Sequence, residues 1–281
     1  MAGILYLVGT PIGNLGDFSE RALKTLESAD FIAAEDTRVT LKLLNHFNIK
    51  KPMISYFEHN KFKRGDDIAA RIEAGETCAL VTDAGMPAIS DPGEDLVALC
   101  SERGIPVAVV PGPCAAVSAL ALSGLHTGRF AFEGFLDANK KSRRERLKAV
   151  QNDNRTLIFY EAPHKLRAAL RDMFEILGDR RVALVREMTK IHEETFRTTL
   201  SQAVDYYSAN EPRGEFVLII EGSNSEVSEA EISEEITETG EQLVELYMNE
   251  GMSRPEAVKR AAKEKGISRS ELYKRTANPN S

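Results

Sequence analysis

Charged side chains gather in two short segments of the N-terminal half. The segment AAEDTR contains Glu35, Asp36 and Arg38, and the segment SYFEHN contains His59. Each follows an apolar, strand-like run, so both are expected at the carboxyl ends of neighbouring strands. Carboxylates, an arginine and a histidine on one rim could bind a polar substrate and remove a proton from it. The alternative is that they are solvated loop tips.

Three loops rich in Gly and Pro also follow strand-like runs. They are GTPIGNLGD from Gly9, TDAGMPAISDPG from Thr82 and PGPCAA from Pro111. Glycine lets a backbone turn tightly and approach a ligand, and an acid among small residues at a strand end suits a ribose or an adenine edge. Alternatively, Asp83 in the second loop only caps a helix. The GxGxxG fingerprint and the Walker A lysine are both missing, which disfavours a nicotinamide enzyme and an NTPase.

Other chemistries find little support in the sequence. It contains no GxSxG motif, and its five histidines lack a triad context and metal-ligand spacing. The three cysteines, Cys78, Cys100 and Cys114, are odd in number, far apart and outside any CxxC motif. We therefore expect neither a disulfide framework nor a zinc site, and no metal in the chemistry.

These segments must be positioned by alternating strands and helices. Helical patterns at Ser19–Ser28, with Ser19 as the N-cap, and at 61–74 separate several of the strand-like runs. Such alternation predicts an α/β protein with largely parallel sheets. In RFAFEGFL (129–136) the spacing of the apolar residues changes. The other strand-like runs are 4–8, 31–35, 53–57, 78–82, 107–110, 156–161, 181–187 and 216–222.

The chain is long enough for more than one domain, because single cores stop growing at about 250 residues. Its 281 residues divide where Pro111–Pro113 closes a strand, and again after Gly222, where the sequence turns polar and acidic. We predict a first α/β domain at 1–112 and a second at 113–222. An acidic linker at 223–235 and a helical module at 236–281 follow.

The C-terminal module has the pattern of a helix-turn-helix. Apolar residues recur at helical spacing before Gly266, and Ile267 and Ser268 then cap a second helix that is expected to turn Leu272 and Tyr273 inward. A helical pair that packs on the body or on a partner subunit fits the same residues. Both interpretations stay open at this point.

The net charge of −7 argues against a protein that coats nucleic acid by bulk electrostatics. Two segments are nevertheless basic, at Lys140–Lys148 and at Arg254–Arg275, and between Glu226 and Glu250 no Lys or Arg occurs. The basic segments could bind a phosphate-bearing substrate. Because no run is long and apolar enough to span a bilayer and no signal peptide is recognisable, we expect a cytoplasmic protein without a membrane partner.

Ten blocks in unbroken order over about residues 4–222 resemble the ribosomal RNA small-subunit methyltransferase I family. These cytidine 2′-O-methyltransferases belong to the tetrapyrrole methylase superfamily, and the C-terminal tail resembles the helix-turn-helix-like module of many members. The chain has Met86 where the family has Thr, and Asp137 where it has Pro. The blocks are GTPIGNLGD, AAEDTR, SYFEHN, TDAGMPAISDPG, PGPCAAVSAL, SGL…RFAFEGFL, KKSRRERL, TLIFYEAPHKL, REMTK…HEE and GEFVLIIEG.

The resemblance implies two α/β domains with S-adenosylmethionine in the cleft between them, and a homodimer. It implies as substrate a cytidine near the decoding centre of 16S RNA, either as naked small-subunit rRNA or within the assembled 30S subunit. Phe159 and the neighbours of Met188 would lie behind the residues that touch the cofactor. The cofactor-binding residues implied are Pro11, Asp83, Gly85, Met86, Cys114, Ala115, Phe159 and Tyr160.

Methyl transfer from a sulfonium to a ribose hydroxyl is an in-line displacement, which the protein assists by orientation and by a proton acceptor. We expect the catalytic, substrate-side rim to consist of Glu35, Asp36, Arg38, His59 and Glu161. One of the acids or His59 would take the proton. The two basic segments would hold RNA phosphates.

Two other functions compete with this hypothesis. A methylase of the same superfamily could act on a tetrapyrrole or a protein side chain, although such substrates do not need the two basic segments. A DNA-binding regulator could read a groove with residues 236–281, although a regulator does not need the charged rim.

Overall fold

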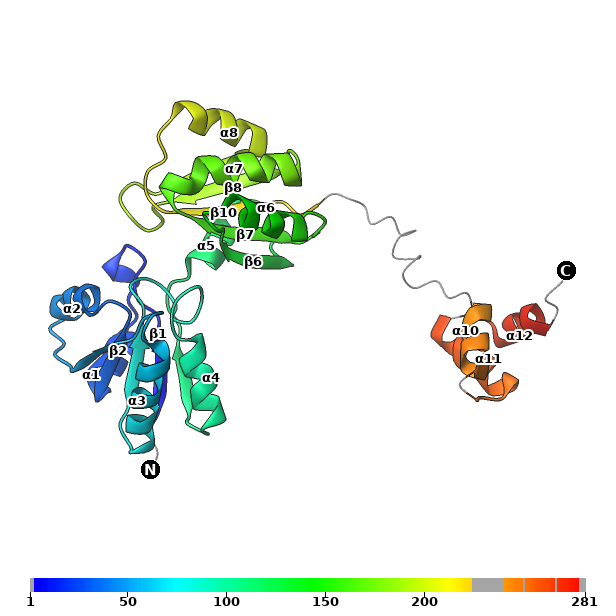
Figure 1. Cartoon of the computed structure of the whole chain (residues 1–281), viewed down its shortest axis with the longest axis horizontal. Helices are drawn as coiled ribbons and strands as arrows, with labels where there is room; N and C mark the ends of the chain where they lie inside the picture. Colours follow the sequence, from blue (N-terminus) through cyan, green and yellow to red (C-terminus); the bar gives the residue numbers. More distant parts are fainter. Residues whose placement is uncertain (1–2, 224–239, 250, 266, 278–281) are drawn as a thin grey trace. The chain divides into compact units, whose positions relative to one another are not determined.

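The protein is described by a computed structural model, which covers residues 3–223, 240–249, 251–265 and 267–277 (Figure 1). It forms two compact units, Met1–Asn224 and Ser225–Ser281, called here the body and the C-terminal unit. Nearly all of the predicted acidic linker at 223–235 lies outside the described residues, and the domain boundaries stay predictions.

The first sheet of the body is parallel throughout, with the strand order β3-β2-β4-β1-β5. β2 and β4 are buried along their whole length, which explains their continuous apolar runs. The carboxyl ends of all five strands meet at one edge. The strands are β1 (Leu5–Val8), β2 (Phe31–Ala34), β3 (Met53–Ser55), β4 (Cys78–Val81) and β5 (Val107–Val110).

Helices cover both faces of the first sheet. Leu26 and Leu44 pack on one face and Ile68 and Leu96 on the other. The Ser19 hydroxyl accepts a 3.1 Å hydrogen bond from the Ala22 amide, which confirms the predicted cap. The first pair of helices is α1 (Glu20–Ser28) and α2 (Thr37–His46), after the 3₁₀ turn η1 (Leu15–Asp17), and the second pair is α3 (Lys61–Glu73) and α4 (Glu94–Glu102).

The second sheet is mixed, with the order β6-β7-β10-β8-β9. Only β6 and β7 pair in parallel, so the expectation of largely parallel sheets is wrong here. The polar edge strand β9 was not predicted, because ETFRTT has no apolar run. A bulge at Gly134 explains the changed period near 129–136. The strands are β6 (Phe130–Phe135), β7 (Thr156–Glu161), β8 (Arg181–Arg186), β9 (Glu194–Thr199) and β10 (Phe216–Ile220).

Different helices cover the two faces of the second sheet, as Figure 1 shows. Along β7, Leu157 and Phe159 point into the core formed with α6, α7 and α8, whereas Ile158 points towards α5. Strand alternation then places Tyr160 on the α5 side. The helices are α5 (Ala115–Ser123), α6 (Lys140–Ala149), α7 (Pro163–Leu177) and α8 (Leu200–Ala209).

The C-terminal unit consists of α10 (Gly240–Asn249), α11 (Arg254–Lys265) and α12 (Arg269–Ala277). Leu272 is fully buried against apolar residues of α10 and α11, as predicted. The prediction for Tyr273 is wrong, because its side chain is 44% exposed. In none of the described residues of either unit does a helix combine the length and the hydrophobicity that crossing a lipid bilayer requires.

A buried ion pair fastens α6 to α7. Arg143 Nε donates a 2.8 Å hydrogen bond to Asp172 Oδ2, and its Nη1 donates to the carbonyls of Asp137 and Ala138. Arg144 Nη1 lies 2.6 Å from the other Asp172 oxygen. The side chains of Arg143 and Asp172 are only 7% and 5% exposed, so this part of the basic segment is structural.

We predict that Asp172→Ala lowers the free energy of unfolding by about 3–5 kcal/mol, because it leaves the Arg143 guanidinium buried without its counter-ion. Glu211→Ala is the matched control, since it removes an exposed carboxylate 3.2 Å from Arg213 and should cost at most about 1 kcal/mol. Urea unfolding of both variants measures the difference. Equal losses would show that the buried pair does not anchor α6.

Candidate active site

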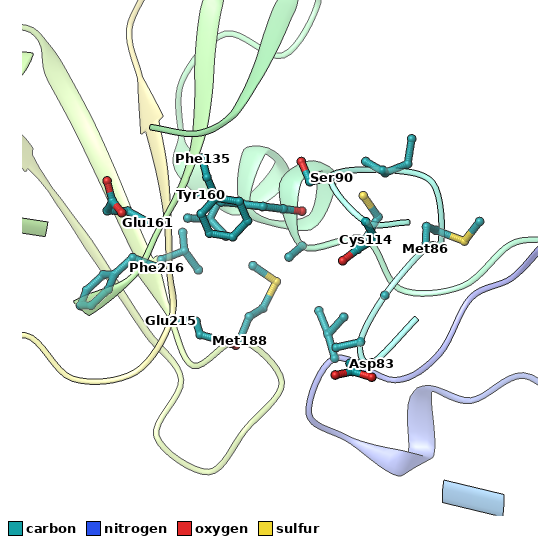
Figure 2. A pocket seen from close by; sticks show the side chains of 18 of the residues that line it. Asp83, Met86, Ser90, Cys114, Phe135, Tyr160, Glu161, Met188, Glu215 and Phe216 are labelled. Atoms are coloured by element: carbon teal, nitrogen blue, oxygen red, sulfur yellow. The ribbon is translucent and has the colours of Figure 1, made fainter. Parts of the chain in front are cut away.

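A pocket of about 320 Å³ lies between the two sheets of the body, a size suited to a small-molecule ligand. Figure 2 shows Asp83, Met86 and Cys114 on one side and Tyr160 and Met188 on the other. The pocket is lined by Ile12, Glu35, Asp83–Met86, Ile89–Asp91, Cys114, Ala115, Phe135, Tyr160–Ala162, Val185, Glu187, Met188, Lys190 and Glu215–Val217.

Close backbone contacts fix the first-sheet side of the pocket. A side chain at Gly9 would place its Cβ 2.7 Å from the Cα of Gly112, so neither position tolerates one. Thr10 and Gly85 form a backbone bridge with N–O distances of 2.9 and 3.1 Å, and the buried Thr10 hydroxyl donates to the Thr82 carbonyl. The loops after β1, β4 and β5 are therefore held together.

Two of the lining loops contain strained backbone. Among the described residues, five that are not glycine have positive φ angles, and four of these five lie in loops at the pocket. They are Ala88 and Ser90 in the loop after β4, and Glu187 and Thr189 in the loop after β8. Such conformations cost about 1–3 kcal/mol each and cluster at functional sites. The pocket is thus a place where the fold tolerates strain.

Acidic groups from β2 and β4 form one wall. The Thr82 hydroxyl donates a 2.6 Å hydrogen bond to Glu35 Oε2, and the Asp36 amide donates a 3.1 Å bond to Asp83 Oδ1. Burial and the negative charge of Glu35 raise the pKa of Asp83. The two strand ends are therefore joined by a network that leaves Glu35 and Asp83 facing the pocket.

Asp36 and Arg38 have a more local role. The Asp36 carboxylate caps α2 by accepting from the Arg38 amide at 2.8 Å, and it forms an ion pair with the Arg38 guanidinium. Hydrogen bonds from the Arg38 side chain lower the pKa of Asp36 to about 2. Neither residue lines the pocket, and the Arg38 side chain is 86% exposed.

Asp91 is an acid that the sequence did not single out. It lines the pocket beside Glu35 and Asp83 and is partly buried. Burial first, and then the negative charge of Glu35, raise the pKa of Asp91 to about 6, although a hydrogen bond with Thr82 opposes the shift. A carboxylate with such a pKa can accept a proton at neutral pH more effectively than an ordinary aspartate.

The opposite wall is aromatic and apolar. The Tyr160 hydroxyl accepts a 3.0 Å hydrogen bond from the Ala116 amide in the first turn of α5, and burial raises its pKa to about 12. Its ring stands edge-on to Phe132 and Phe135, with centroids 5.0 and 5.3 Å away. Met188 lines the same wall. A flat apolar ligand group would fit against these side chains.

The structure brings eight of the thirteen predicted site residues to the pocket. These are Glu35, Asp83, Gly85, Met86, Cys114, Ala115, Tyr160 and Glu161. Pro11, Asp36, Arg38, His59 and Phe159 do not line it. His59 is exposed in the turn before α3, and Phe159 is fully buried on the opposite side of β7 from Tyr160.

Glu161 is placed differently from the expected substrate-side rim. Its side chain is 1% exposed, and Figure 2 shows its carboxylate turned away from the Tyr160 ring. Oε1 accepts from the Ala162 amide at 2.9 Å and lies 3.7 Å from Lys165 Nζ, whereas Oε2 has no hydrogen-bond partner among the described atoms. Burial raises its pKa. A carboxylate in this position orders the start of α7.

Several lining residues were missed by sequence reasoning. Ile12, Ser90 and Asp91 lie inside motifs that the sequence did identify, so their loops were found but their roles were not. Phe135 and Lys190 lie in the blocks RFAFEGFL and REMTK, but neither residue was singled out there, and only the fold brings them to the pocket. Among the described residues, no group of three or more His, Cys, Asp or Glu side chains could hold a metal ion.

Comparisons with known proteins agree with this architecture. The family model for tetrapyrrole (corrin/porphyrin) methylases matches residues 4–204. The chain belongs to the tetrapyrrole methylase family. Within this family it is 46% identical over 272 residues to ribosomal RNA small subunit methyltransferase I of Synechocystis sp., covering 96% of both chains. It is 49% identical to the protein of that name from Thermotoga maritima, covering 78% of this chain and 99% of that one.

Solved tetrapyrrole methylase structures share the fold. Uroporphyrin-III C-methyltransferase from Thermus thermophilus, crystallised with S-adenosylhomocysteine, has a TM-score of 0.55 at 18% identity and covers 77% of this chain and 97% of its own. The two-sheet α/β architecture is that of the family, and the chain is a methyltransferase whose methyl donor is S-adenosylmethionine.

The lining of the pocket fits this donor. S-adenosylmethionine carries a sulfonium, an ammonium and a ribose diol, for which Glu35 and Asp83 offer carboxylates. Tyr160 and Phe135 offer an apolar wall for an adenine. The N-terminus of α5, where the N-cap Cys114 makes no side-chain hydrogen bond, offers amides for a carboxylate.

We predict that Gly85→Ala weakens S-adenosylmethionine binding at least tenfold, because the new methyl group borders the pocket and lies 3.4 Å from Ile12. Gly85 has a φ of +90°, so the substitution also costs about 1–2 kcal/mol of stability. Gly104→Ala is the control, since Gly104 has a φ of +66° and no neighbour within 4 Å of its Cβ position. Calorimetric titration should show unchanged binding for the control, and equal weakening in both variants would contradict the assignment of the pocket.

Proposed function

We propose that the chain transfers a methyl group from S-adenosylmethionine to the ribose 2′-hydroxyl of a cytidine in small-subunit rRNA. The observation that carries the proposal is a pocket with an acidic and an aromatic wall, in a chain 46% identical over nearly its whole length to a protein named for rRNA methylation. Naked rRNA and the assembled 30S subunit are both candidate substrates, and the cytoplasm is the compartment where either is found.

The bound cofactor supplies an electrophilic methyl group. The chain must hold the hydroxyl close to this group and in line with it, which accounts for much of the rate in such displacements. The strained loop from Gly85 to Asp91 and the packed Gly9 loop provide a rigid support for that purpose. The exposed Arg38 and His59 lie outside the pocket, where they would contact the RNA around the target nucleotide.

A carboxylate of the acidic wall takes the proton in this proposal. Glu35 already accepts the Thr82 hydroxyl, Asp36 pairs with Arg38, and Glu161 is turned into the body. Asp91 has no charged partner of opposite sign among the described residues, lines the pocket and has a pKa of about 6. It therefore combines access with basicity better than the other acids, and we assign it the proton-accepting role.

The basic segment offers fewer unpaired cations for phosphate contacts than the sequence suggested. Arg143 and Arg144 pair with Asp172, and Arg146 lies 2.7 Å from Glu133. Lys140 and Lys148, together with Lys141, are exposed and form no ion pair with another described residue. These three lysines are the ones that would contact phosphates.

The function is tested by incubating the protein with methyl-labelled S-adenosylmethionine and small subunits that lack the modification. Nuclease digestion and mass spectrometry then locate the label. We expect one labelled cytidine, with the methyl group on the ribose. Label on a base, or no label in RNA despite cofactor binding, would reject the proposed substrate.

The assignment of Asp91 predicts a pH dependence. Asp91 must be deprotonated to accept a proton, so the single-turnover rate should fall about tenfold per pH unit below 6 and level off above it. Asp91→Asn should lower the plateau at least a hundredfold and leave cofactor affinity within threefold. Asp67→Asn, at an exposed position on α3, is the control. A wild-type profile that persists in Asp91→Asn would exclude this residue as the acceptor.

A homodimer is also part of the proposal. Apart from Ser118 and Ser123, α5 consists of apolar residues, and while Ala119 and Leu120 pack on the second sheet, Val117 and Leu122 remain 53% and 38% exposed. An exposed apolar helix face of this kind is typical of a subunit interface. Val117→Glu should give a monomer in sedimentation velocity, whereas Lys24→Glu on α1 should not. A wild-type monomer at micromolar concentration would contradict a homodimer.

A further inference from the structure

The C-terminal unit presents a basic face whose role does not follow from the pocket. The sequence from 254 to 277 contains eight Lys or Arg and three Glu, directly after a stretch without any Lys or Arg. Such a local excess of positive charge in a chain of net charge −7 points to a polyanionic partner.

The cations of α12 lie on its exposed side. Leu272 is fully buried in the core of the unit, whereas Arg269, Ser270, Tyr273 and Lys274 are exposed. Arg269 and Tyr273 are four residues apart, as are Ser270 and Lys274, so all four lie on one face of the helix. Neither Arg269 nor Lys274 forms an ion pair with a described side chain, and both are therefore available to a ligand.

The N-terminus of α11 extends this face. The Arg254 guanidinium lies 5.9 Å from the centre of the Tyr273 ring, so a third cation adjoins the exposed side of α12. Arginine, lysine, serine and tyrosine side chains, together with a helix N-terminus, are the groups that contact phosphates in protein complexes with nucleic acids. Arg254, Arg269, Ser270, Tyr273 and Lys274 are called here the α12 face.

The unit is also separable from the methyltransferase body. The Thermotoga maritima relative aligns over 220 residues, which is 99% of its own length and close to the length of the body. It therefore lacks a counterpart for about a fifth of this chain. A unit that such a relative does without is suited to substrate binding and not to the chemical step.

We propose that the α12 face binds the phosphodiester backbone of the substrate RNA outside the target nucleotide. This inference rests on the proposed function for the identity of the RNA. The contacts are made to phosphates, so they add affinity without sequence specificity. They weaken as the salt concentration rises, because the release of counterions from the RNA is then less favourable.

The test compares two full-length double variants. Arg269→Ala/Lys274→Ala removes two cations of the α12 face, and Lys259→Ala/Lys263→Ala removes two exposed cations from a different side of α11. The dissociation constant for rRNA is measured by filter binding from 50 to 200 mM salt. For the first variant we expect affinity to fall about tenfold at 50 mM and the slope of log affinity against log salt to decrease by about two. The second variant should change neither quantity more than twofold.

Further measurements separate this inference from the proposed function. Arg269→Lys/Lys274→Arg retains both charges and should bind as wild type, which controls for folding. At saturating RNA the first variant should keep the wild-type kcat, because the pocket is intact. Equal losses of RNA affinity in both Ala variants, or no loss in the first, would overturn the proposed role of the α12 face. Absence of methyl transfer by wild type would instead reject the proposed function, while the binding comparison would still decide the role of α12.

Discussion

The contact between the backbones of Gly9 and Gly112 is the constraint on which the site depends. A Cβ on Gly9 would lie 2.7 Å from the Cα of Gly112, so the loops after β1 and β5 can meet only because both residues lack side chains. The Thr10–Gly85 bridge adds the loop after β4. Three loops that are distant in sequence thereby form one surface at the carboxyl edge of a parallel sheet, where ligands of α/β proteins bind.

The second sheet supplies the opposite wall of the pocket. β7 carries Tyr160 towards the acids of the first sheet, and the parallel strand β6 carries Phe135 there beyond its bulge. One wall is then acidic and the other aromatic. A sulfonium cofactor with an adenine and a cationic amino acid portion complements such an asymmetric pocket.

Much of this could be predicted from sequence. Parallel strands buried on both faces have continuous apolar runs, so the first sheet was recognisable, and its Gly- and Pro-rich loops marked the pocket. The edge strand β9 was not predicted because its sequence is polar. Phe159 lies behind Tyr160 and not in the pocket, because successive residues of a strand face opposite sides and Tyr160 took the pocket side. Local sequence does not reveal which of two successive residues faces a ligand.

Charge was the hardest property to predict. The basic segment suggested an RNA-binding surface, but Asp172 lies in α7 and only the packing of α6 shows that Arg143 is neutralised. The proposed role of Asp91 depends on Glu35, which is distant in sequence and close in space. Electrostatic behaviour arises from the three-dimensional neighbours of a group, and a motif alone does not contain them.

The most direct measurement is a crystal structure with S-adenosylhomocysteine and a short cytidine-containing oligonucleotide. We predict that the cofactor sulfur lies in the pocket between Met86 and Tyr160, with a ribose 2′-oxygen within hydrogen-bonding distance of Asp91. A cofactor bound elsewhere on the body, or a ribose approached by no carboxylate of the acidic wall, would contradict it.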